Sequence, residues 1–141
     1  MSDVHCRRYI DADRDELVAL WVRVFPHASP HNAPLKMLTE KLKVDDLVFV
    51  ATLDGDIVGA CMAGYDGHRG WLYAVAVAPE QRRTGVGRAL LRYTLSALAR
   101  LGCGKVNLQI RAGNSEVIAF YRSLGFVIEA RVSMACRLTE G

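Results

Sequence analysis

The stretch that decides the fold of this 141-residue chain is Trp71-Leu-Tyr-Ala-Val-Ala-Val-Ala-Pro-Glu-Gln-Arg-Arg-Thr-Gly-Val-Gly-Arg-Ala-Leu-Leu91. It begins with Trp71–Ala78, a run of apolar, aromatic and β-branched residues that predicts a buried strand. Arg82–Gly87 follows as a basic loop that contains two glycines. From Val86 to Leu101 apolar residues recur at helical spacing, and Gly102 is the signal that ends this helix.

The loop between the strand and the helix has the composition of a phosphate site. Gly85 and Gly87 carry no side chain, so a ligand can approach the backbone N–H groups, and the helix N-terminus adds partial positive charge. A P-loop is excluded because it needs a Gly-Lys-Ser/Thr ending, and a dinucleotide fingerprint because Leu90 stands where it needs a small residue. The alternative is that the glycines only turn the chain. The cations around the loop are Arg82, Arg83 and Arg88.

The composition predicts one globular domain over residues 1–141, with 51% hydrophobic and 23% charged residues. The sequence has no apolar run of the roughly 20 residues that span a membrane, and no signal-peptide core, so a cytoplasmic protein without a membrane partner is expected. The net charge of +3, without a basic stripe, argues against a nucleic-acid partner. Four scattered cysteines predict free thiols and no metal site: Cys6, Cys61, Cys103 and Cys136.

The remaining segments predict an α+β fold with a central mixed, twisted sheet and about four flanking helices. The hairpin signal Asp54-Gly55-Asp56 makes the N-terminal half antiparallel, and the strand–helix–strand order around the basic loop predicts a parallel crossover. Asp13, three residues before Glu16, gives a start like a capping box, and the proline-rich loop Pro26–Pro34 is expected to lack regular structure. Further strands are expected at Cys6–Ile10, Leu47–Leu53, Ile57–Tyr65 and Lys105–Ile110, with one or two within Phe126–Leu138. Three further helices are predicted from apolar residues at helical spacing. The first has Leu17, Leu20, Trp21 and Val24, the second Leu35, Leu38 and Leu42, and the third Val117, Ile118, Tyr121 and Leu124.

The chain contains two motifs. The first is Arg82-x-x-Gly85-x-Gly87 after the strand ending Ala76-Val77-Ala78-Pro79, and the second is Asn114-Ser-Glu-Val-Ile-Ala-Phe-Tyr-Arg-Ser-Leu-Gly-Phe126. Both resemble motifs of the GNAT superfamily of acetyl-CoA-dependent N-acetyltransferases. They occur in the family's order, separated by a predicted helix and strand. The resemblance covers essentially the whole chain and implies the GNAT fold. Gly64–Gly70, together with Asn32-x-Pro34, is similar to small bacterial GNAT proteins of the YpeA type.

The resemblance implies that acetyl-CoA is the co-substrate, and it assigns backbone and side-chain roles in binding it. Backbone groups of Val75 and Val77 would bond the pantetheine arm, as an added strand would, and N–H groups of the basic loop would hold the pyrophosphate. Each role has a structural alternative, such as core packing, helix capping or a solvated basic surface. The implied cofactor residues are Val75, Ala76, Val77, Arg82, Arg83, Thr84, Gly85, Val86, Gly87, Arg88, Asn114 and Tyr121.

The resemblance also assigns the acid of the reaction and leaves the base open. Tyr121 would lie near the thioester sulfur and protonate the leaving thiolate, since a phenol remains protonated at neutral pH. Many GNAT enzymes carry a glutamate base on the central strand where this chain has Tyr73. The amine would then lose its proton to Tyr73 through water, or to His31 or His68. Acceptor contacts are expected from His31, Asn32, Tyr65 and His68, and no metal is expected.

The resemblance, together with Tyr121, implies an enzyme that transfers an acetyl group from acetyl-CoA to a primary amine by direct attack in a ternary complex. The acceptor is expected to be a small molecule or a peptide. Because the glutamate base is missing, the alternative is a non-catalytic acyl-CoA-binding or regulatory module on the same fold. Sheet edges near the C-terminal strands could pair two subunits, so a homodimer is a further expectation.

Overall fold

The structure, a computed structural model, describes residues 3–139 apart from the side chain of His31. Contacts between residues divide the chain into two compact units, Met1–Leu108 and Gln109–Gly141. The expectation of a single domain over residues 1–141 therefore stays a prediction.

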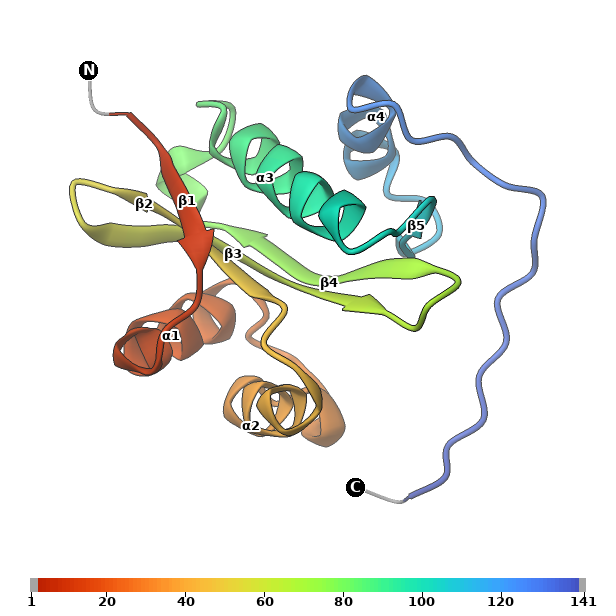
Figure 1. Cartoon of the computed structure of the whole chain (residues 1–141), viewed down its shortest axis with the longest axis horizontal. Helices are drawn as coiled ribbons and strands as arrows, with labels where there is room; N and C mark the ends of the chain where they lie inside the picture. Colours follow the sequence, from red (N-terminus) through yellow and green to blue (C-terminus); the bar gives the residue numbers. More distant parts are fainter. Residues whose placement is uncertain (1–2, 140–141) are drawn as a thin grey trace. The chain divides into compact units, whose positions relative to one another are not determined.

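The first unit is built on a five-stranded mixed sheet (Figure 1). The strands lie in chain order, with antiparallel pairing from β1 to β4 and parallel pairing between β4 and β5. The predicted fold class and mixed sheet are confirmed. The strands are β1 (His5–Arg8), β2 (Val48–Leu53), β3 (Asp56–Tyr65), β4 (Gly70–Val77) and β5 (Val106–Asn107).

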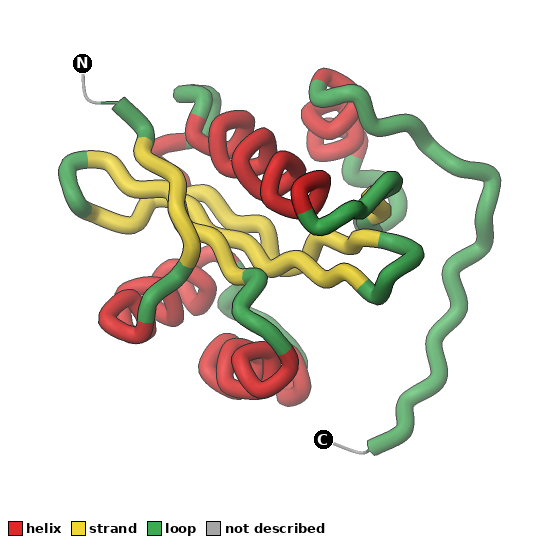
Figure 2. The backbone as a smooth tube through the Cα atoms, viewed as in Figure 1, coloured by secondary structure: helices red, strands yellow, loops and turns green. Residues whose placement is uncertain are grey.

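Helices cover both faces of this sheet (Figures 1 and 2). Helices α1 (Arg14–Val24) and α2 (Pro34–Val44) lie on one face, and α3 (Val86–Arg100) lies on the other. Their apolar faces and the central strands form the core. The largest fully buried side chains include Trp21, Phe49, Leu17, Leu38, Leu90, Leu91 and Leu98.

Local signals placed the turns of the first unit correctly. Asp54 and Gly55 both have positive φ, 51° and 85°, as a two-residue hairpin turn requires, and they join β2 to β3. Helix α3 ends at Arg100, followed by Gly102 at φ 97°. The hairpin and the end of the central helix are confirmed.

The start of α1 differs from the predicted capping box. Asp13 has helical φ and ψ and makes no side-chain cap with α1. Its carboxylate accepts two hydrogen bonds from Arg7, at 2.7 and 2.9 Å, and one from the Ile10 N–H at 2.9 Å. Glu16 accepts a hydrogen bond from the Ile57 N–H at 2.7 Å. The two carboxylates of the predicted capping box thus bind groups of the sheet: Asp13 binds the Arg7 guanidinium of β1, and Glu16 binds the Ile57 N–H of β3. Both of these donors need acceptors.

Two further segments of the first unit depart from the predicted boundaries. Residues Pro30–Asn32 form a 3₁₀ turn, because a proline in the first position sets φ for a helical turn. The expectation that the whole loop Pro26–Pro34 lacks regular structure is therefore wrong. The strand expected at Lys105–Ile110 is only Val106–Asn107, because β4 pairs with it at Gly70 and Trp71 alone.

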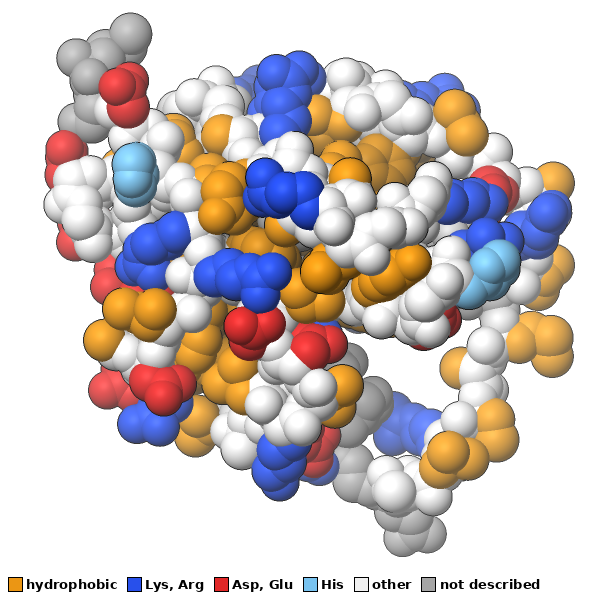
Figure 3. Space-filling view, in the orientation of Figure 1, with side chains coloured by type: hydrophobic (Ala, Val, Ile, Leu, Met, Phe, Trp, Pro, Cys, Tyr) orange, Lys and Arg blue, Asp and Glu red, His pale blue; other side chains and the backbone are white. Residues whose placement is uncertain are grey.

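The second unit contains α4 (Ser115–Ser123) and a C-terminal segment without regular structure. The strands expected within Phe126–Leu138 are wrong, since no strand is assigned among the described residues 109–139. A strand needs a partner for its backbone groups, and within its own unit this segment has none. Its apolar side chains are exposed, including Val127, Val132, Met134 and Leu138 (Figure 3).

Within the described residues, every helix is too short or too polar to cross a lipid bilayer.

The Asp13–Arg7 pair predicts a pH-dependent contribution to stability. The Arg7 hydrogen bonds hold the pKa of Asp13 below its usual range. A lowered folded-state pKa means that the stabilisation is complete above about pH 4, the unfolded value, and is lost as the pH falls through the folded pKa. We expect Asp13→Asn to lower the free energy of unfolding by about 1 kcal/mol at neutral pH. The difference from wild type should shrink toward acid pH, as measured by urea unfolding.

Asp15→Asn is the matched control, because Asp15 also faces an arginine but is fully exposed. Its Oδ1 lies 3.8 Å from the Arg14 Nε. We expect it to change the free energy of unfolding by less than about 0.5 kcal/mol. A loss for Asp13→Asn that stays constant down to acid pH would contradict the role of the Asp13 charge.

Candidate active site

A bulge interrupts β4 at its middle. Two residues of β4, Ala74 and Val75, stand opposite the single residue Cys61, between the pairs Ala60–Ala76 and Met62–Tyr73. Ala74 has φ 50°, a left-handed conformation that costs a non-glycine residue roughly 1 kcal/mol. Such a residue bends and twists the strand. The bulge is therefore a local departure of β4 from the sheet.

Within the described part of the first unit, the backbone of β4 has no strand partner along one edge beyond the bulge. The Ala78 N–H donates to the Val58 carbonyl at 2.8 Å, so Ala78 forms a hydrogen-bonded pair with β3. Pairs alternate along an antiparallel ladder, so the N–H and C=O of Val77 point away from β3. On that side β5 pairs only with Gly70 and Trp71. This edge offers backbone groups to a ligand, at a place where the sequence predicts pantetheine binding.

The basic loop follows directly after β4. Pro79–Gln81 is a 3₁₀ turn, Arg83 and Gly85 have φ 64° and 91°, and α3 begins at Val86. The Thr84 hydroxyl donates to the Gln81 carbonyl and fixes the turn. The helical ladder begins with the Ala89 N–H bonded to the Gly85 carbonyl at 3.0 Å, so the N–H groups of Val86 and Gly87 precede this ladder. They point out of the helix N-terminus, where an anion is favoured.

Side chains around the loop differ in their exposure. Arg82, Arg83 and Thr84 are exposed, and Arg88 is half-buried. Val86 is buried, and a Cβ built on Gly59 would lie 3.1 Å from its Cγ1, so the first turn of α3 packs closely on β3. Val86 therefore packs α3 against the sheet, and its role in cofactor binding stays a prediction. Gly85 is exposed as well.

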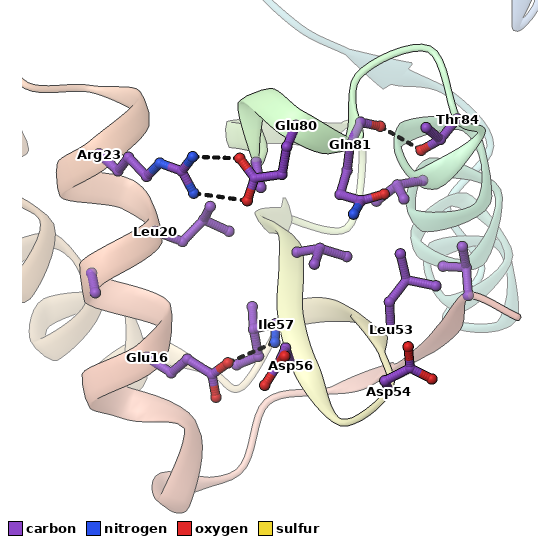
Figure 4. Close-up of a pocket in the computed structure, with 15 residues that line it drawn as sticks. Glu16, Leu20, Arg23, Leu53, Asp54, Asp56, Ile57, Glu80, Gln81 and Thr84 are labelled. Atoms are coloured by element: carbon purple, nitrogen blue, oxygen red, sulfur yellow. Dashed lines mark hydrogen bonds and ion pairs between the residues drawn. The ribbon is translucent and has the colours of Figure 1, made fainter. Parts of the chain in front are cut away.

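A hollow of about 660 Å³ adjoins the loop on the side of α1 and the β2–β3 turn (Figure 4). Of the residues implied in cofactor binding, Thr84 and Val86 line it. Its wall also carries the carboxylates of Glu16, Asp54, Asp56 and Glu80 and the guanidinium of Arg23, which pairs with Glu80. Carboxylates outnumber this single cation, so the hollow is unfavourable for the phosphates of a cofactor.

Helix α1 is joined to the loop and to the bulge. Arg23 and Glu80 form a bidentate ion pair between α1 and the 3₁₀ turn (Figure 4), with Nη1 and Oε1 3.0 Å apart. The Trp21 indole N–H donates to the Ala74 carbonyl at 2.8 Å. The sequence pattern identifies Trp21 only as one of the apolar residues on one face of a helix. The available signal was that a buried indole N–H needs an acceptor, but nothing local identifies which one.

Three of the residues expected to act in the reaction belong to the β3–β4 hairpin: Tyr73 lies in β4 beside the bulge, and Tyr65 and His68 lie at its turn. Tyr73 is 48% exposed, and partial burial, with a smaller effect of Asp66, raises the pKa of its phenol. A raised pKa keeps Tyr73 protonated at neutral pH, so little phenolate is present to accept a proton. The Tyr65 hydroxyl donates to the Gly67 carbonyl at 3.3 Å, and His68 lies exposed in the turn.

The other two acceptor residues lie between α1 and α2. Asn32 is exposed and ends the 3₁₀ turn, with its N–H bonded to the Ser29 carbonyl at 2.8 Å. The backbone of His31 is in the same turn, but its side chain lies outside the described part of the structure. Within residues 3–139, no group of three or more His, Cys, Asp or Glu side chains could hold a metal ion.

Asn114 and Tyr121 belong to the second unit. Asn114 is the N-cap of α4, and its side chain accepts from the Val117 N–H at 3.2 Å. Tyr121 is buried, with edge-to-face ring contacts to Phe120 and Phe126 at centroid distances of 5.2 and 5.4 Å. The capping and packing alternatives are therefore real. The cofactor and catalytic roles of both residues stay predictions.

Comparison with known proteins assigns the family. The sequence profile described as Acetyltransferase (GNAT) family matches residues 14–126. The chain is a member of the GNAT acetyltransferase family. An acetyltransferase of Sodalis glossinidius is 38% identical over 121 residues, which are 85% of this chain and 84% of that protein. An acetyltransferase of Pectobacterium atrosepticum is 36% identical over 129 residues, which are 91% of each chain.

Solved structures agree with the fold of this acetyltransferase. The aminoglycoside N-acetyltransferase AAC(6')-Iy, in complex with CoA, has a TM-score of 0.82 at 22% identity, over 99% of this chain and 97% of that chain. The ribosomal-protein-S18-alanine N-acetyltransferase from Escherichia coli has a TM-score of 0.75 at 27% identity, over 87% of this chain and 77% of that chain. The predicted GNAT fold and enzyme class are confirmed.

The left-handed conformation of Arg83 predicts opposite effects of glycine at two adjacent arginines. We expect Arg83→Gly to raise the free energy of unfolding by roughly 0.5–1 kcal/mol, because glycine adopts φ 64° without strain. Arg82→Gly is the matched control, since Arg82 has φ −66° and glycine there adds only chain entropy to the unfolded state. It should lower stability by a similar amount in urea unfolding. Shifts in the same direction would contradict the conformation of the loop.

Proposed function

We propose that the protein transfers an acetyl group from acetyl-CoA to a primary amine by direct attack in a ternary complex. The observation that carries this proposal is the continuity of the open β4 edge with the basic loop. The edge offers strand-like hydrogen bonds to a pantetheine arm, and the loop offers N–H groups to the pyrophosphate at the end of the same strand. Acetyl-CoA has these two parts in this order.

The family relatives support both substrates of this reaction. AAC(6')-Iy was solved with CoA and with a bisubstrate analogue of CoA and monomethyl-acetylneamine, and the Escherichia coli enzyme acts on the alanine of ribosomal protein S18. An aminoglycoside and a peptide terminus both present an amine. We propose the amine as the acceptor group, with small amines and peptide N-termini as the two arms of a substrate screen.

The proposed step forms one bond and breaks one bond. The amine nitrogen attacks the thioester carbonyl carbon, the C–S bond breaks, and the products are an amide and CoA. The thiolate takes a proton from Tyr121, and the amine loses a proton to a base. The carbonyl oxygen, which gains negative charge, accepts a hydrogen bond from a backbone N–H of β4. Among the three bases considered, the raised pKa of Tyr73 favours His31 or His68.

A covalent acyl-enzyme is not part of this proposal. Burial raises the pKa of the Cys61 thiol to about 12, opposed by a contact with Thr94, so it remains a neutral, poorly nucleophilic thiol. Cys61 lies on the strand opposite the bulge, next to the proposed thioester position. Direct attack therefore predicts that both substrates bind before any product leaves.

Calorimetric titration tests the cofactor assignment. We expect acetyl-CoA to bind with a Kd in the micromolar range, and dephospho-CoA to bind more weakly than CoA if an arginine contacts the 3′-phosphate. Arg82→Gln should then reduce the difference between the two cofactors. Arg92→Gln, an exposed arginine within α3, is the control and should leave it unchanged. Failure of the wild-type protein to bind acetyl-CoA would refute the proposed function.

Replacing Tyr121 by Phe tests the proposed acid. We expect Tyr121→Phe to lower kcat by about 10²-fold while acetyl-CoA affinity stays within about twofold, because the phenol acts only when the thiolate leaves. Tyr93→Phe is the matched control, because Tyr93 contacts Phe49 in the first unit and should leave kcat unchanged. Turnover of Tyr121→Phe at the wild-type rate, measured by thiol release, would remove the acid role.

A further inference from the structure

The Trp21 indole connects α1 to the β4 bulge at a single atom. Trp21 is fully buried, and its Nε1–H donates to the Ala74 carbonyl at 2.8 Å across 53 residues of sequence. Burial removes the indole N–H from water, and leaving it without an acceptor would cost free energy. The hydrogen bond to Ala74 avoids this cost. The acceptor is the carbonyl of the one β4 residue with a left-handed backbone.

The geometry of a peptide unit carries this contact to the next residue. The peptide between Ala74 and Val75 is trans, as are all peptide bonds described here. In a planar trans peptide the C=O and the N–H point in opposite directions. Because the Ala74 carbonyl is directed at the indole from α1, the Val75 N–H is directed away from it. Backbone groups of alternate residues in a strand point to the same side. Val75 precedes Val77 by two residues, so we infer that its N–H also points to the open edge of β4.

We propose that Trp21 is a positioning residue for acyl transfer. Its indole fixes the Ala74–Val75 peptide so that the Val75 N–H donates to the thioester carbonyl of the acyl donor on the open edge of β4. The proposal rests on the proposed function above. It deepens it by naming the side chain that holds the β4 N–H in place for the developing oxyanion.

Helix α1 is held firmly enough to serve this role. Glu16 accepts from the Ile57 N–H at 2.7 Å near one end of the helix, and Arg23 pairs with Glu80 near the other. These contacts secure α1 to the start of β3 and to the turn after β4. Trp21 therefore approaches the bulge from a helix that is fixed on both sides of it.

The test replaces Trp21 by 3-benzothienylalanine, in which sulfur takes the place of the indole N–H with nearly the same ring shape. The readout is the isotope-edited infrared band of the carbonyl of [1-¹³C]acetyl-CoA bound to the full chain. In the wild type we expect the bound band at lower wavenumber than the free thioester. In the variant we expect it to move back toward the free position, and kcat to fall about tenfold or more with any amine that gives turnover. Affinity for CoA, which has no thioester carbonyl, should stay within about twofold.

The same replacement at Trp71 is the matched control. Trp71 is half-buried at the start of β4, and no hydrogen bond from its indole is described within residues 3–139. Its variant should keep the wild-type carbonyl band. Trp21→Phe is a second variant without the N–H, and thermal unfolding checks that each variant is folded.

Each of the following results would overturn part or all of the proposal. A bound carbonyl band at the wild-type position in a folded Trp21 variant would overturn the positioning role. A wild-type band at the position of the free thioester would overturn the role of the Val75 N–H. An equal loss of affinity for CoA and acetyl-CoA in the variant would make Trp21 a packing residue only. A wild-type protein that binds CoA and acetyl-CoA equally poorly would refute the proposed function, and this inference with it.

Discussion

The hydrogen bond between the Trp21 indole and the Ala74 carbonyl supports the least regular point of the sheet. A left-handed alanine in the middle of a strand is unfavourable by roughly 1 kcal/mol, and a buried hydrogen bond of about that strength offsets it. The bulge bends β4, and β5 pairs with this strand only before the bulge, at Gly70 and Trp71. The open edge that follows is the part of the protein on which the proposed chemistry depends.

Helix α1 therefore has a role beyond covering the sheet. Its contacts run from the start of β3, through the bulge, to the turn before the basic loop, with Glu16, Trp21 and Arg23 as the contacting residues. A loop with two residues of positive φ would sample several conformations if it were held only by its own turn. The Arg23–Glu80 pair holds one end of this loop, and the packing of Val86 against β3 holds the other.

Charge separates the two sides of the basic loop. N–H groups at the start of α3 and the arginines favour an anion on one side, whereas the hollow beside α1 carries carboxylates. This separation leaves the helix N-terminus as the favourable place for a pyrophosphate.

Asn114 and Tyr121 lie in the second unit, so the acid of the proposed reaction and the open edge come from different parts of the chain.

The sequence by itself determined the features that depend on neighbouring residues. Periodicity identified β4 and α3, glycines identified the turns at Gly55 and Gly102, and the basic loop was recognisable because its strand, arginines and helix are contiguous. Only the tertiary structure decided the bulge at Ala74, the donor that supports it, and the partners of Asp13 and Glu16. The physical reason is distance along the chain. The Trp21 and Glu16 contacts join residues 53 and 41 positions apart, and a local pattern shows that a polar group needs a partner but not which distant backbone group the fold will bring to it.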